Sequence, residues 1–144
     1  MSKKASQKES TNNILQALKE AQAKSDYITP EFAAELAESC SVPVSDIYGV
    51  ASFYSFLATE PSGRNTIRIC QSLPCHLKDG QAVIDAVAKE TGIKPGNVTP
   101  DSRFSFHLTN CIGLCDGAPA MLVNHDVYTD LTPGKIAGIL KKYQ

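Results

Sequence analysis

Four of the five cysteines form two pairs, Cys70-x4-Cys75 and Cys111-x3-Cys115, with 35 residues between the pairs. Each pair lies where a predicted strand gives way to a loop. Four cysteine thiolates are the usual ligands of a [2Fe–2S] or a [4Fe–4S] cluster. A two-iron cluster takes two sulfurs per iron, which matches two separate pairs. The pattern therefore predicts one [2Fe–2S] centre held by Cys70, Cys75, Cys111 and Cys115.

Other uses of these cysteines compete with the cluster. A structural zinc site also takes four cysteines, usually paired at two-to-four-residue spacing in compact ribbons. A thioredoxin-type dithiol would need Cys-x-x-Cys, which the sequence lacks. Two disulfides would require an oxidising environment. The cluster is favoured, and a zinc-stabilised interaction module is kept as an alternative.

The remaining cysteine and the histidines are not predicted to be ligands. Cys40 shares an apolar stripe with Phe32 and Leu36, so we expect it to be a buried free thiol. His76 adjoins Cys75, but four thiolates already complete the shell. We expect His76 at most to tune the site through hydrogen bonds.

Residues 13–62 are predicted to form an N-terminal helical bundle, because their apolar residues recur at a spacing near 3.6. Thr29 followed by Pro30 is a typical helix start. A third helix is expected over residues 44–57 and is apolar on two sides. Such a helix is either deeply buried or shared with a partner surface.

Residues 63–144 alternate predicted strands and helices in the order strand, helix, strand, strand, helix. This order is typical of a thioredoxin-like open sheet with helices packed on it. In such a sheet, the loop after residue 70 and the loop around residues 111–115 leave the same edge. The fold class expected is therefore α/β: a thioredoxin-like domain preceded by a three-helix bundle.

Composition excludes several classes of function. The net charge is −1, from 14 basic and 15 acidic residues, so the basic excess of a nucleic-acid-binding module is absent. No apolar stretch approaches the ~20 residues of a membrane span. Residues 1–12 lack the apolar segment of a secretory signal and are expected to be a disordered leader. We expect a cytoplasmic protein with reduced thiols and no direct membrane insertion.

Three motifs occur together and in order: Tyr48-Gly-Val-Ala-Ser-Phe-Tyr54, Cys70-x4-Cys75, and Cys111-Ile-Gly-Leu-Cys115-x3-Pro119. The combination resembles the thioredoxin-like [2Fe–2S] ferredoxin subunit of NADH dehydrogenases. That family includes the small peripheral subunit of respiratory complex I and the small subunits of NAD-linked, electron-bifurcating iron-only hydrogenases and formate dehydrogenases. The likeness covers roughly residues 14 to 143.

The resemblance implies that the same four cysteines are the cluster ligands. It also implies that the N-terminal helices, in the region of Tyr48, Phe53 and Phe56, dock on a partner subunit that binds flavin and NAD(H) and carries further iron–sulfur clusters. Residues 115–124 look closer to the hydrogenase and formate dehydrogenase relatives than to complex I. A complex I type subunit is the alternative.

No nucleotide-binding motif is present, since the sequence has neither Gly-x-Gly-x-x-Gly after a strand nor a P-loop. NADH delivers two electrons as a hydride, and a flavin is the usual device that separates them. FMN and NAD(H) are therefore expected in the partner only. The chain is expected to serve an oxidoreductase that has a further catalytic subunit, without a catalytic site of its own. A free-standing ferredoxin shuttle is the rival.

Overall fold

The structure, a computed structural model, describes residues 3–143, with side chains from residue 14 onward. The chain divides into two compact units, with the boundary between Pro61 and Ser62. The sequence places this boundary between residues 62 and 63. Each unit has a hydrophobic core of its own, and each is described by itself below.

The N-terminal unit consists of three helices, α1 (Lys3–Ser25), α2 (Pro30–Cys40) and α3 (Val44–Phe53). The Thr29 hydroxyl accepts a hydrogen bond from the Phe32 N–H at 3.2 Å, which caps α2 as predicted. In the described part of the chain, none of the helices combines the length and hydropathy that a membrane span requires. The core of this unit consists of Ile14, Leu18, Ile28, Ala33, Leu36, Ala37, Ile47 and Ala51.

Two helices of this unit differ from the sequence expectation. Helix α1 begins at Lys3, within the segment for which a disordered leader is expected. Residues 3–12 contain alanine, lysine, glutamine and glutamate, which have high helix propensity and can extend the helix that follows toward the N-terminus. Helix α3 ends at Phe53 rather than near residue 57, and Tyr54 has extended backbone angles. The Gln22 side chain holds the segment after α3: it donates to the Phe56 carbonyl and accepts from the Ala58 N–H.

The C-terminal unit is a five-stranded open sheet with the order β2-β3-β1-β4-β5. Strand β1 pairs in parallel with β3 and antiparallel with β4, and the two edge pairs are antiparallel. The predicted architecture, an open sheet preceded by three helices, is confirmed. The elements are β1 (Asn65–Cys70), α4 (Leu73–Leu77), α5 (Gly80–Thr91), β2 (Asn97–Val98), β3 (Phe104–Thr109), β4 (Met121–Val123), β5 (Asp126–Tyr128), α6 (Pro133–Leu140) and the short 3-10 helix η1 (Lys141–Tyr143).

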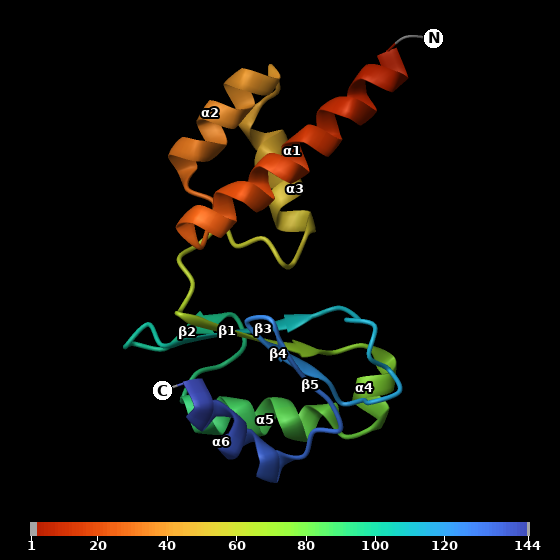
Figure 1. Cartoon of the computed structure of the whole chain (residues 1–144), viewed down its shortest axis with the longest axis vertical. Helices are drawn as coiled ribbons and strands as arrows, with labels where there is room; N and C mark the ends of the chain where they lie inside the picture. Colours follow the sequence, from red (N-terminus) through yellow and green to blue (C-terminus); the bar gives the residue numbers. More distant parts are fainter. Residues whose placement is uncertain (1–2, 144) are drawn as a thin grey trace. The chain divides into compact units, whose positions relative to one another are not determined.

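Helices α5 and α6 lie on one face of this sheet (Figure 1). The strands turn alternate side chains toward these helices, as the period of two requires. The sequence does not predict α4 or β2, which have five and two residues. The shared core contains Ile67, Ile69, Val83, Val87, Phe104, Phe106, Met121, Val123, Leu131, Ile136, Ile139 and Leu140.

Candidate metal centre

The parallel pairing of β1 with β3 brings the two cysteine loops to one edge of the sheet. Cys70 is the last residue of β1 and lies opposite Thr109, the last residue of β3. Just beyond, the Gln71 N–H donates to the Thr109 carbonyl at 3.0 Å. Both chains then leave the sheet on the same side, one toward Cys75 and the other toward Cys111. This confirms the expected placement of the two loops.

The first pair is buried, because α4 turns the chain back toward the end of β1. Pro74 lies in the first turn of this short helix, where its missing N–H costs nothing. Cys70 and Cys75 are 2% and 1% exposed. They pack together with Ala118, which comes from the loop that carries the second pair. The two cysteine loops are therefore in contact.

The second pair lies at the surface. The sulfurs of Cys111 and Cys115 are 3.3 Å apart, and both residues are exposed. Gly113 has φ = 84°, a conformation that glycine adopts without strain, and its N–H donates to Cys111 Sγ at 3.4 Å. Gly113 therefore holds the loop backbone close to the sulfur of Cys111.

The four thiols influence one another electrostatically. Burial raises the pKa of the Cys70 thiol, but hydrogen bonds from the Ser72 backbone, Cys75, the Ser72 hydroxyl and the Ile112 backbone outweigh it, so the net pKa is lowered. Burial raises the pKa of Cys75, and the charges of Cys70 and Cys115 add to that increase. Cys70 is therefore the readier of the buried pair to ionise.

Cys115 connects the exposed pair to the buried pair. Its hydrogen bond with Cys111 is the largest influence that raises its pKa, followed by burial and by the charges of Cys111, Cys70 and Asp116. Like charges so close resist simultaneous ionisation unless cations are gathered among them. The four sulfurs therefore form one electrostatically interacting set.

The donor set has the composition that a two-iron cluster requires. Within residues 3–143, no group of three or more His, Cys, Asp and Glu side chains converges on a single metal position. The cysteines are instead arranged as two pairs: Cys70 and Cys75 lie in one buried cluster, and the sulfurs of Cys111 and Cys115 are 3.3 Å apart. Two iron ions bridged by two sulfides take two thiolates each, so the two pairs fit such a group.

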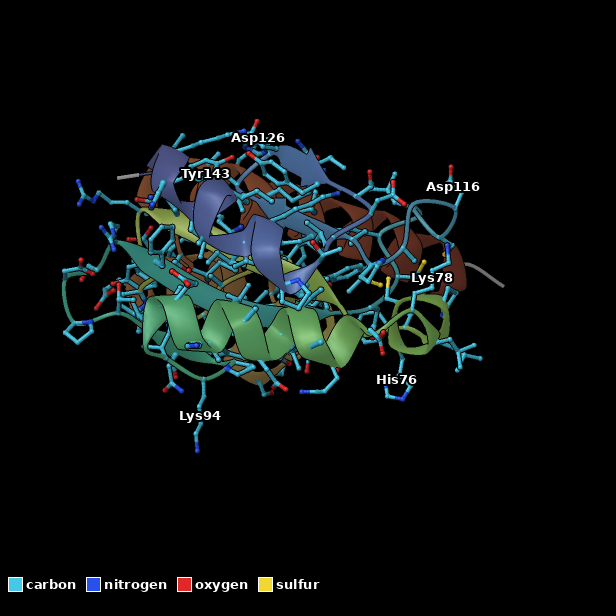
Figure 2. The ribbon with its side chains drawn as sticks, turned by 90° about the horizontal axis from the view of Figure 1, so that it is seen from below. His76, Lys78, Lys94, Asp116, Asp126 and Tyr143 are labelled. Carbon is cyan, nitrogen blue, oxygen red and sulfur yellow. The ribbon has the colours of Figure 1, made fainter. Side chains whose placement is uncertain are left out.

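Other residues near the site lie differently from expectation. His76 is exposed and points away from the sulfur atoms (Figure 2), so the tuning role expected of it has no contact to support it. Cys40 is only half-buried, because α2 turns it toward the rim of the N-terminal core. Lys78 donates from Nζ to the Asp116 carbonyl at 3.4 Å. No sequence pattern reveals that contact.

A family of known proteins shares this pattern of residues. The model of the thioredoxin-like [2Fe–2S] ferredoxin family matches residues 1–144. The chain belongs to this family. The thioredoxin-like [2Fe–2S] ferredoxins carry a [2Fe–2S] cluster, and the donor set described above fits that group.

Two kinds of relative are about equally similar to this ferredoxin. One is a subunit of the NADH-quinone oxidoreductase of Escherichia coli strain K12, which is 37% identical over 130 residues that cover 90% of this chain and 78% of the relative. The other is the HndA subunit of the NADP-reducing hydrogenase of Solidesulfovibrio fructosivorans. It is 36% identical over 131 residues, which cover 91% of this chain and 77% of the relative.

A solved structure is also similar. The air-oxidised NAD⁺-reducing [NiFe]-hydrogenase contains a chain that superposes on this ferredoxin with a TM-score of 0.75 and 31% sequence identity. The superposition covers 91% of this chain but only 22% of the hydrogenase chain. The ferredoxin therefore corresponds to one part of a larger protein there.

Proposed function

We propose that this chain is the electron-transfer [2Fe–2S] subunit of a multi-subunit, NAD(H)-linked flavoprotein oxidoreductase. The observation that carries the proposal is the convergence of two cysteine pairs at one sheet edge in a member of a [2Fe–2S] ferredoxin family. When bound, a [2Fe–2S] cluster accepts and releases single electrons. FMN and NAD(H) belong to the partner subunit in this proposal.

Cys70, Cys75, Cys111 and Cys115 are the proposed ligands. The buried pair provides two sulfurs that water does not reach, and the exposed pair provides two at the surface. Leu73 and Leu77, which are 66% and 73% exposed, flank the site on α4. Exposed apolar side chains beside a redox site are typical of a surface that another protein covers.

The proposed complex is of the soluble, electron-bifurcating hydrogenase or formate dehydrogenase type. The support is the similarity to the HndA hydrogenase subunit and to the NAD⁺-reducing [NiFe]-hydrogenase. A complex I type subunit is the second candidate, favoured by the similarity to the NADH-quinone oxidoreductase of E. coli. We place the protein in the cytoplasm, where five free cysteines remain reduced.

The N-terminal helices are the proposed docking site for the flavoprotein subunit. Phe53 is 79% exposed and Phe56 is 46% exposed, and Tyr48 lies on the same helix as Phe53. The Phe53 ring makes an edge-on contact with Tyr54, with centroids 5.1 Å apart. Gln22 fixes the backbone at Phe56, so the aromatic side chains are presented by an ordered segment. Exposed aromatic residues of this kind are common anchors of protein interfaces.

The docking proposal is tested with the double variant Phe53→Ser/Phe56→Ser. We expect its affinity for the flavoprotein subunit to fall by about tenfold or more, the usual cost of removing interface anchors. Iron content and helicity should stay unchanged. Val127→Ser, which removes a 52% exposed apolar side chain from β5, is the matched control and should bind normally. Normal binding by the double variant would contradict the docking site.

The electron-transfer function is tested by reduction with NADH under anaerobic conditions. The proposal predicts that NADH leaves the isolated chain oxidised and reduces it once the flavoprotein subunit is added. Electron paramagnetic resonance of the chain's cluster is the readout. Reduction by NADH without a partner, or no reduction in its presence, would contradict the proposed function.

A further inference from the structure

Lys78 lies at the junction of α4 and α5 and reaches across to the second cysteine loop. Its ammonium donates to the carbonyl of Asp116 at 3.4 Å, and Asp116 directly follows Cys115. Figure 2 shows Lys78 directed toward the loop of Asp116 beside the sulfur atoms. Lys94 lies beyond the opposite end of α5 and points away from the sulfurs. One side chain therefore joins the loops that carry the two cysteine pairs.

The backbone is held firmly at both ends of this contact. Asp79 has φ = 58°, and a Cβ at Gly80 would lie 2.5 Å from the carbonyl oxygen of Cys75, so α5 begins in close contact with α4. In the other loop, the Asp130 N–H donates to the Gly117 carbonyl at 2.7 Å. The contact of Lys78 therefore spans two anchored segments.

We propose that Lys78 is a positioning residue of the cysteine site, which ties the Cys75 loop to the Cys115 loop and favours the reduced, more negative state of the site. The inference rests on the proposed function, because it assumes that the two cysteine pairs hold one redox cluster between them. A charged donor gives a stronger hydrogen bond than a neutral one. A positive charge near an iron–sulfur centre raises its reduction potential, because it stabilises the more negative reduced state.

The test uses the full chain, reconstituted anaerobically, in four forms: wild type, Lys78→Met, Lys78→Arg and Lys94→Met. Lys78→Met keeps the length of the side chain and removes its charge and its donor. Lys78→Arg keeps both, and Lys94→Met removes an equivalent charge far from the sulfurs. Two quantities are measured for each: the rate of iron release to a ferrous chelator and the midpoint potential by electron paramagnetic resonance titration.

We expect Lys78→Met to release iron roughly two- to tenfold faster than wild type, the range that one net hydrogen bond corresponds to. Its midpoint potential should become more negative. Lys78→Arg should keep the wild-type rate of iron release and the wild-type midpoint potential, and Lys94→Met should match wild type in both. Wild-type values for Lys78→Met would overturn the proposal, as would equal effects of Lys78→Met and Lys94→Met or a failure of Lys78→Arg to restore both values. A wild-type chain that binds no iron and sulfide would instead refute the proposed function.

Discussion

Gly80→Ala is the substitution for which the structure predicts the sharpest local effect. A Cβ at this buried position would lie 2.5 Å from the carbonyl oxygen of Cys75 and 2.9 Å from its carbonyl carbon. Real Cβ atoms essentially never approach closer than 3.0 Å, so α4 and α5 must separate by at least the 0.5 Å difference. The atoms that must give way belong to the backbone of a proposed ligand.

The expected cost is a loss of about 1–3 kcal/mol of unfolding free energy, the range for overpacking a closely packed position. The helix propensity of alanine recovers little, because Gly80 is the first residue of α5. With a urea m-value of about 1–3 kcal/mol/M, the unfolding midpoint of the C-terminal unit should fall by roughly 1 M. The Cys75 thiol should also become accessible to a thiol-labelling reagent.

The assay is pulsed thiol labelling of the cluster-free full chain across a urea series, read by mass spectrometry. Cys70 and Cys75, which are 2% and 1% exposed, report the opening of this unit. Gly138→Ala in α6 is the matched control, because a Cβ there meets nothing within 4 Å. The control should gain up to about 1 kcal/mol. If Gly80→Ala labels at the same urea concentration as wild type, the close-approach argument is wrong.

Two further predictions concern the ligands and a half-buried histidine. Cys111→Ser should lose or badly destabilise the cluster, whereas Cys40→Ser should keep it; an unaltered visible spectrum of Cys111→Ser would refute the ligand assignment. Burial, and secondarily the charge of Arg68, lower the folded-state pKa of His107 below 6.5. The unfolded chain therefore binds the proton more readily, and the unfolding free energy should fall as the pH drops below about 6.5 toward the folded pKa. Urea unfolding between pH 7.5 and 5.5 should show this slope in wild type and lose it in His107→Gln; an equal slope in both would contradict it.

The sequence predicts the site's position in the fold because strong local patterns determine it. Residues 66–70 and 104–109 alternate in polarity as strands do, and β1 and β3 occupy these segments. Gly92 ends α5 with φ = 72°, the left-handed conformation expected after a helix. Once both strands are parallel, their following loops must share one edge. The two cysteine pairs, which lie in and beside these loops, are therefore expected close together.

The features that the sequence does not reveal depend on contacts between distant residues. The apolar pattern of α3 continues past Phe53, but hydrogen bonds from Gln22 hold the following segment outside a helix. Helix α4 is a single turn, too short to show a helical period. Lys78 and Asp116 are 38 residues apart, and only the folded chain brings them together. Ser105 is fully buried, although the alternation in its strand predicts an outward position.

The most direct test of the central claim is an ultraviolet–visible spectrum of anaerobically purified protein, with iron, acid-labile sulfide and zinc assayed on the same sample. One [2Fe–2S] cluster should give visible charge-transfer bands and about two irons and two sulfides per chain. A colourless protein that holds about one zinc per chain would contradict the electron-transfer function and indicate a zinc-stabilised interaction module.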